Sequence, residues 1–179
     1  ILDVGCYTTS AARLVAGVAQ GKPFLDPVEV KGTAHIGPTG CDEYAVAALK
    51  FPGGIVAQCS TGVQVNQDNL LRIYGSDGDI LVPNPWVPAR EGGTSKIIVR
   101  KAGAKEPEEV EVHTDEYLYA IEADTVAKYL EQRQSPTMSW DDTLGNMRTL
   151  DQWRQSIGQV YDAEKPQASR ITVSGSTRA

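Results

Sequence analysis

The feature that most constrains the fold is a change of hydrophobic period along the chain. Residues 1–16 carry apolar side chains at helical spacing, and from Val28 apolar residues alternate with polar ones, as in a β-strand. Gly17 is predicted to end the first helix, and helical spacing returns after residue 118. Further strands are predicted at 43–51, 54–65, 70–74, 79–82, 96–100 and 109–113. Pro52, Gly53 and Gly54 predict a tight hairpin turn between the first two of these strands, and the last two are predicted to form another hairpin. Segregation of strands from helices predicts an α+β fold: an open, mostly antiparallel β-sheet with helices packed on one face.

The chain of 179 residues is long enough for one domain with a core. We expect that domain to cover residues 1–161, followed by a polar tail at 162–179. Ile1 is not a methionine and no lead-in precedes the first helix, so we expect the chain to be the later part of something larger.

Composition excludes some classes of partner. The net charge of −6 argues against nucleic-acid binding, which needs Lys and Arg to neutralise phosphates. No apolar run approaches the ~20 residues that span a bilayer, so no membrane partner is expected. Three cysteines far apart in the sequence (Cys6, Cys41 and Cys59) are typical of small thiols in a reducing cytoplasm, and with two histidines in the chain no metal site is predicted.

The predicted strand at 43–51 has no clearly polar face. Tyr44, Val46 and Ala48 alternate with Ala45, Ala47 and Leu49. Helices that cover one face of a sheet leave such residues exposed on the other, so we expect self-association into a homodimer or tetramer through the open face.

The first residues of the chain hold the strongest chemical candidates. In a helix from Ile1 to Ala16, Asp3 and Tyr7 lie four residues apart on one face, and a carboxylate beside a phenol is a combination that acid–base chemistry uses. Spacing alone favours a structural interpretation, in which Asp3 caps the helix and Tyr7 is a half-buried aromatic. Arg13 either pairs with a carboxylate or lies on a solvated face.

An ordered set of motifs resembles a known family. The set comprises Asp3-Val4-Gly5-Cys6-Tyr7 with Ser10-Ala11-Ala12-Arg13, then Phe51-Pro52-Gly53-Gly54, Ile73-Tyr74-Gly75-Ser76-Asp77-Gly78 and Tyr119-x-x-Glu122. Together they resemble the C-terminal domain of the Gfo/Idh/MocA oxidoreductases, in the branch of dihydrodiol dehydrogenase, NADP-dependent xylose dehydrogenase and glucose–fructose oxidoreductase.

The resemblance implies an NAD(P)-dependent enzyme that transfers hydride to or from a sugar, polyol or trans-dihydrodiol. It implies that NADP or NAD binds mainly to an N-terminal Rossmann domain, and no G-x-G-x-x-G occurs in this chain. We therefore expect no Rossmann domain and no cofactor-binding residues here, and expect the fragment alone to be inactive.

By the same resemblance Tyr7 is the proton-transferring catalytic residue, Asp3 is its orienting partner, and Tyr119 reaches the substrate. On pattern alone Tyr119 and Glu122 belong to a core-facing helical stripe. Tyr7 replaces the family's usual histidine and Ser10 its second acid, which makes an inositol-dehydrogenase-like activity less favoured. Glu164-Lys165-Pro166 has the letters of another family motif, but its place in the polar tail indicates coincidence. The alternative function is a non-catalytic dimerisation or interaction module derived from this fold.

Overall fold

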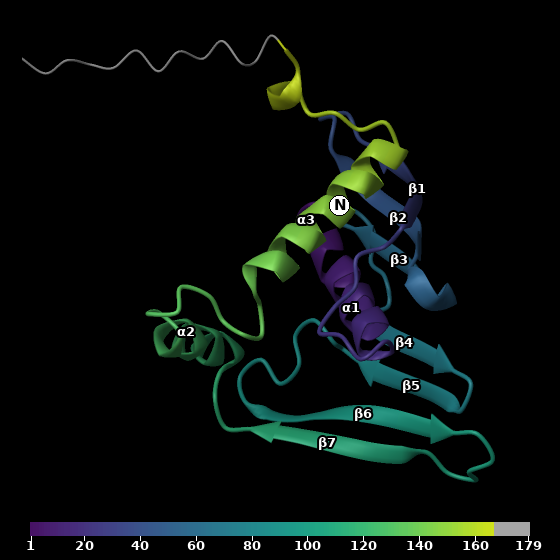
Figure 1. The fold of residues 1–179 in the computed structure, drawn as a ribbon, viewed down its shortest axis with the longest axis vertical. Coiled ribbons are helices and arrows are strands. Elements are labelled where there is room, and N and C mark those ends of the chain that lie inside the picture. The colour runs from purple at the N-terminus through teal and green to yellow at the C-terminus, as the bar shows by residue number, and fades with distance from the viewer. Residues whose placement is uncertain (167–179) are drawn as a thin grey trace, which may run out of the picture. The chain divides into compact units, whose positions relative to one another are not determined.

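The computed structural model describes residues 1–166 and divides them into two compact units (Figure 1). The first unit contains residues 1–66 and the segment that begins at Asp141, and the second contains residues 67–140. Elements of the first unit are α1 (Gly5–Val18), β1 (Glu29–Ile36), β2 (Asp42–Lys50), β3 (Val56–Gly62) and α3 (Trp140–Ser156), whose first residue lies in the second unit.

Strands β1, β2 and β3 form an antiparallel sheet in chain order. The register pairs Gly32 of β1 with Ala47 of β2, and Ala47 with Cys59 of β3. The connection from β2 to β3 is a short 3-10 turn, Pro52–Gly54, in which Gly53 has a φ of 77°. Because glycine adopts positive φ without steric cost, the Pro-Gly-Gly sequence closes the hairpin as predicted.

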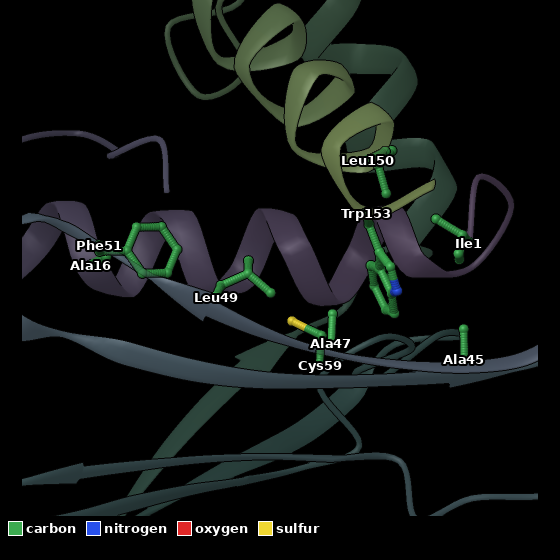
Figure 2. Packing of buried hydrophobic residues seen from close by; sticks show 9 residues of the cluster. All are labelled: Ile1, Ala16, Ala45, Ala47, Leu49, Phe51, Cys59, Leu150 and Trp153. Atoms are coloured by element: carbon green, nitrogen blue, oxygen red, sulfur yellow. The ribbon is translucent and has the colours of Figure 1, made fainter. Parts of the chain in front are cut away.

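The core lies on one face of this sheet, under α1 and α3 (Figure 2). Along β2 the buried residues are Ala45, Ala47 and Leu49, whereas Tyr44 and Val46 are exposed. The first set therefore faces the core, and the second set lies on the outer face of the sheet. Trp153 of α3 is fully buried with its indole towards the sheet. The buried apolar cluster comprises Ile1, Ala16, Ala45, Ala47, Leu49, Phe51, Cys59, Leu150 and Trp153.

Two glycines make room for close packing in this unit. A Cβ on Gly32 would lie 2.6 Å from Nε1 of Trp153, so the absence of a side chain lets the indole reach the strand. A Cβ on Gly17 would overlap the backbone of Phe24. We expected Gly17 to end the first helix, but α1 continues to Val18, and the glycine serves the close approach of the returning loop.

The second unit is built from β4 (Leu70–Gly75), β5 (Gly78–Pro83), β6 (Gly93–Lys101), β7 (Glu108–Thr114) and α2 (Leu118–Lys128). Its strands form an antiparallel sheet in chain order. Ion pairs join neighbouring strands: Lys96 to Glu109 at 2.6 Å, and Arg100 to Asp79 at 2.9 Å. The predicted strands, including the hairpin of β6 and β7, are all present.

The α+β class with antiparallel strands is confirmed, but the strands of the described residues form two sheets rather than one. The polar run from Gln64 to Asn69 lies between β3 and β4 and belongs to neither ladder. The predicted division at residue 161 stays a prediction. Within the predicted tail, Asp162–Glu164 forms a 3-10 turn, and residues 167–179 lie outside the described residues.

Two expectations for the helices were wrong. Helix α1 begins at Gly5 rather than Ile1, and its N-cap Val4 makes no side-chain capping bond, so Asp3 lies in the preceding turn and does not cap the helix. The stripe of α2 that we expected to face a core is exposed, at 60% for both Tyr119 and Val126. Helical period identifies an apolar face but not its partner, and the less exposed residues of α2 are Leu118, Ile121 and Thr125.

Candidate functional site

Tyr7 lies in the first turn of α1 with 53% of its side chain exposed, whereas Gly5 and Thr9 on the same helix are buried. Asp3 is also exposed, four residues earlier in the chain. The Gly5 amide donates to the carbonyl oxygen of Ile1 at 2.8 Å, so hydrogen bonding of helical spacing extends one turn before the helix. The backbone therefore places both candidates one turn apart with their side chains open to an incoming molecule.

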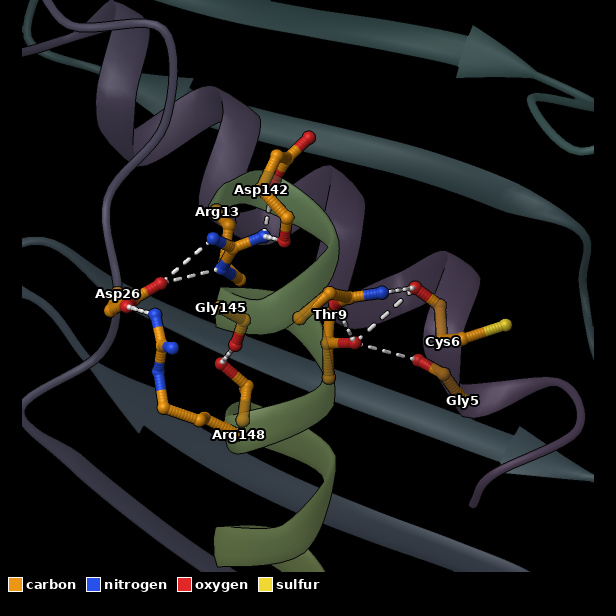
Figure 3. A network of polar contacts seen from close by, with 10 residues as sticks. Gly5, Cys6, Thr9, Arg13, Asp26, Asp142, Gly145 and Arg148 are labelled. Atoms are coloured by element: carbon orange, nitrogen blue, oxygen red, sulfur yellow. Dashed lines mark hydrogen bonds and ion pairs between the residues drawn. The ribbon is translucent and has the colours of Figure 1, made fainter. Parts of the chain in front are cut away.

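The side of α1 away from solvent is tied to α3 by polar contacts (Figure 3). The hydroxyl of Thr9, which is fully buried, donates to Oδ1 of Asn146 at 2.7 Å. Nδ2 of Asn146 in turn donates to the carbonyl oxygen of Cys6 at 3.1 Å. These two bonds hold the turn of α1 that carries Tyr7 against α3.

Arg13 fixes the same helix two turns further along (Figure 3). Its guanidinium is fully buried and donates to Oδ1 of Asp26 from Nε at 3.0 Å and from Nη2 at 2.7 Å. Nη1 donates to the carboxylate of Asp142 and to its carbonyl oxygen, and the guanidinium also lies over the ring of Phe24 at 4.8 Å. Of the two interpretations of Arg13, pairing with carboxylates is the one observed.

Asp26 links this cluster to the surface, because Arg148 of α3 also donates to it, from Nη2 to Oδ2 at 3.1 Å. Burial by itself would raise the pKa of Asp26, but the hydrogen bonds and positive charges of Arg13 and Arg148 outweigh burial and lower the pKa. The carboxylate is therefore held in its charged form, as the buried guanidinium requires.

Cys6 lies next to Tyr7 but is poorly suited to nucleophilic chemistry. Burial raises the pKa of its thiol, and Sγ lies 3.1 Å from the carbonyl oxygen of Asp3, to which it donates. The thiol consequently stays protonated at neutral pH and helps to hold the turn before α1.

Tyr119, the predicted substrate-binding residue, belongs to α2 in the second unit. Its ring is exposed and lies beneath the guanidinium of Arg90, with 5.5 Å from Cζ to the ring centroid. Tyr119 therefore does not share a unit with the predicted catalytic pair, Asp3 and Tyr7.

Residues 1–166 do not form a dinucleotide-binding unit of the Rossmann type. That unit needs parallel strands joined by a helix whose N-terminus meets the pyrophosphate, and each pairing between the named strands is antiparallel. Glu164 is bound to Arg154, and Lys165 lies 2.5 Å from Asp162, so both residues have local structural partners.

Across residues 1–166, His, Cys, Asp and Glu side chains nowhere gather in a group of three or more that could hold a metal ion. None of the helices in that range combines the length and apolar character needed to cross a membrane.

Residues 1–81 match the family model described as GFO/IDH/MocA C-terminal domain. This part of the chain is similar to the Gfo/Idh/MocA oxidoreductases. The match covers the Asp3–Tyr7 motif and the whole β1–β3 sheet, and it confirms the family that the sequence motifs predicted.

Two curated relatives fall in the predicted branch. The chain is 26% identical over 151 residues to D-xylose 1-dehydrogenase (NADP(+)) 2 of Haloferax volcanii, a match that covers 84% of this chain and 43% of the relative. It is 33% identical over 89 residues to trans-1,2-dihydrobenzene-1,2-diol dehydrogenase of Danio rerio, covering 49% of this chain and 25% of the relative. The chain thus spans less than half the length of either relative.

Solved structures share the fold at low sequence identity. KijD10, a 3-ketoreductase from Actinomadura kijaniata solved with TDP-benzene and NADP, aligns with a TM-score of 0.71 and 18% identity over 87% of this chain and 46% of that one. UDP-N-acetylglucosamine 3-dehydrogenase GnnA from Acidithiobacillus ferrooxidans aligns with a TM-score of 0.68 and 15% identity, with the same coverage. At these identities the likeness concerns the fold alone.

Sequence reasoning did not find Thr9, Asn146, Asp26 or Asp142. Each is a common polar residue with no motif of its own, and three of them reach α1 from distant parts of the chain. Arg13 was the one signal available, since a charged residue on an otherwise apolar helix face requires a partner if that face is buried.

Proposed function

We propose that this chain is the substrate-binding half of an NAD(P)-dependent oxidoreductase that transfers hydride to or from a sugar, polyol or trans-dihydrodiol. The observation that carries the proposal is the exposed Tyr7 in the family motif, on a helix whose opposite side is held by Asn146 and by the ion pairs of Arg13. The relatives, a xylose dehydrogenase and a dihydrodiol dehydrogenase, support this substrate class.

In this proposal Tyr7 is the catalytic residue that exchanges a proton with the reacting oxygen of the substrate. A hydroxyl that is oxidised must lose its proton, which the phenolate form of a tyrosine within hydrogen-bond reach can take; in the reverse reduction the phenol returns this proton to the substrate oxygen. Asp3, one turn earlier, orients the substrate or the phenol by hydrogen bonding, and Tyr119 contributes to substrate binding. NADP or NAD binds mainly to an N-terminal domain outside this chain, so the 179 residues alone are inactive.

The test is Tyr7→Phe in the complete protein, assayed with NADP⁺ and either D-xylose or trans-1,2-dihydrobenzene-1,2-diol. The variant removes the hydroxyl and keeps the ring. We expect kcat to fall roughly 10²-fold or more, the scale of a general acid–base group, with an unchanged circular dichroism spectrum. An unchanged kcat would assign Tyr7 to packing. Titration of the 179-residue chain with NADPH tests the cofactor part, and tight binding would contradict it.

A second candidate function has its own observation. The outer face of the β1–β3 sheet exposes Tyr44, Val46 and Val56, and a shallow hollow of about 220 Å³ beside Ala48 and Val56 lies on the same strands. We infer that this face joins copies of the chain into a homodimer or tetramer, in the enzyme or in a non-catalytic interaction module. A stable interface buries about 1,200 Å² or more.

Sedimentation tests this association. Val46→Lys places a charge at the centre of the face and should yield a monomer, whereas Gln152→Lys on the exposed side of α3 should not. A wild-type protein that sediments as a monomer at micromolar concentration would refute the interface.

A cytoplasmic location is also part of the proposal, and it accords with the free thiols of Cys6, Cys41 and Cys59.

A further inference from the structure

Asn146 of α3 makes two directional bonds to the first turns of α1. Its Oδ1 accepts from the buried hydroxyl of Thr9 at 2.7 Å, and its Nδ2 donates to the carbonyl oxygen of Cys6 at 3.1 Å. The same hydroxyl lies 3.1 Å from the carbonyl oxygen of Gly5, so Thr9 sits close to the helix backbone on this side (Figure 3). The oxygen and the nitrogen of the Asn146 amide therefore both bind the same turn of α1.

That turn is the one that carries Tyr7. The Cys6 carbonyl belongs to the peptide group that links Cys6 to Tyr7, and Thr9 follows Tyr7 by two residues. The Tyr7 side chain, which is 53% exposed, takes its direction in part from the backbone of its turn. Asn146 holds that turn on both sides of Tyr7, through the carbonyl oxygen of Cys6 and the hydroxyl of Thr9. The ion pairs of Arg13 act six residues away, which is about 9 Å along the helix.

The polar character of this contact is informative. An aliphatic residue at position 146 would pack α3 against α1 without the cost of withdrawing an amide from water. Apolar contacts, however, tolerate small rotations and slides of a helix, whereas two hydrogen bonds to fixed backbone and side-chain atoms do not. Compared with an aliphatic residue, Asn146 contributes less apolar packing between the two helices, but its hydrogen bonds fix the rotation of α1 about its axis.

We propose that Asn146 is a positioning residue for Tyr7: it fixes the rotation of the first turn of α1, and with it the direction of the phenol hydroxyl. The inference rests on the proposed catalytic role of Tyr7. A displacement of about 1 Å of a reacting group can cost about 10²-fold in rate, so loss of the two bonds should lower kcat about tenfold or more.

A double-mutant cycle in the complete protein tests this inference. The four proteins are the wild type, Asn146→Leu, Tyr7→Phe and the double variant, assayed with NADP⁺ and the same two probe substrates. If Asn146 acts through Tyr7, Asn146→Leu lowers kcat about tenfold or more in the wild type and has no further effect once the hydroxyl is gone. An equal loss in both backgrounds, or no loss in either, would overturn the inference.

The outcomes separate this inference from the proposed function. A Tyr7→Phe variant with full activity defeats the role of Tyr7 itself. A Tyr7→Phe variant that is inactive beside a fully active Asn146→Leu variant defeats only the positioning role. Gln152→Leu, at an exposed position of the same helix, is the matched control and should keep the wild-type kcat.

Two gentler variants guard against misfolding, and a second measurement is independent of turnover. Thr9→Val removes the hydroxyl at constant shape, and Asn146→Asp keeps the acceptor for Thr9 but loses the donor to Cys6. Each of these variants should lower kcat when residue 7 is tyrosine and should have no further effect in the Tyr7→Phe variant. Amide hydrogen exchange of residues 7–10 should be faster in each variant and unchanged in Gln152→Leu. Unchanged exchange at these amides would overturn the inference.

Discussion

Gly145 of α3 leaves the space that the guanidinium of Arg13 occupies. A Cβ at residue 145 would overlap Nη2 of Arg13 and Oδ1 of Asp26, the two atoms that form the 2.7 Å bond between α1 and the following loop. A glycine inside a helix ordinarily costs about 1 kcal/mol relative to alanine. Here the missing side chain allows a fully buried charge to meet both of its carboxylates.

Gly145→Ala should therefore destabilise the protein although it favours the helix. The Arg13 side chain is flexible in principle, but four hydrogen bonds hold it, so relief of the overlap breaks part of the cluster. We expect the free energy of unfolding to fall by about 1–3 kcal/mol in urea denaturation. Gly5→Ala in α1 is the control, because its Cβ would meet Trp153 at an ordinary 3.4 Å. Equal stabilities of the two variants would contradict this account.

Arg13 and Arg148 both bind Asp26, but only Arg13 is buried, and their removal should differ in cost. Arg13→Met leaves the carboxylates of Asp26 and Asp142 without their buried partner, and we expect a loss of about 3–5 kcal/mol. Arg148 is 59% exposed, so Arg148→Met should cost about 1 kcal/mol or less. Chemical denaturation of both variants measures the contrast, and similar losses would show that burial does not set the energy of this cluster.

The stability of this cluster should depend on acid pH in a defined direction. The pKa of Asp26 is lower in the folded state than in the unfolded chain, so the unfolded chain binds a proton more readily. The stability that this group contributes therefore increases as pH rises from the folded pKa to the unfolded pKa. The contribution is complete above the unfolded value of about 3.9 and disappears as pH falls through the folded value. The gap in unfolding free energy between wild type and Asp26→Asn should be wide at neutral pH and narrow below about pH 4. A gap independent of pH would contradict the assignment.

The three thiols should differ in reactivity towards iodoacetamide. Cys41 is exposed, whereas burial raises the pKa of Cys59 to about 11 and also raises the pKa of Cys6. Since the thiolate is the reactive form, Cys41 should be alkylated first and Cys59 only on unfolding, as read by peptide mass spectrometry. In denaturant all three should react, which serves as the control. Rapid native-state labelling of Cys59 would show that the core opens locally.

The sequence determined the helices and strands of this protein and the family that it resembles. Alternation on β2 and helical spacing in α1 and α3 are local patterns, because each follows from the periodicity of one backbone conformation. The motif from Asp3 to Tyr7 is likewise contiguous, and it led to the family that the match over residues 1–81 confirms. Pro52, Gly53 and Gly54 predicted their turn because proline and glycine restrict or extend the φ values of single residues.

Tertiary structure decided what no local pattern contains. Period 2 on β2 gives two faces, and only the packing of Trp153 and Leu150 selects Ala45, Ala47 and Leu49 as the inner one. The stripe of α2 that begins at Tyr119 predicted burial, yet burial needs a partner surface that helical spacing does not specify. Asn146 meets Cys6 across 140 residues of sequence, and such a contact arises when helices pack, because a hydrogen bond depends on the final positions of its donor and acceptor.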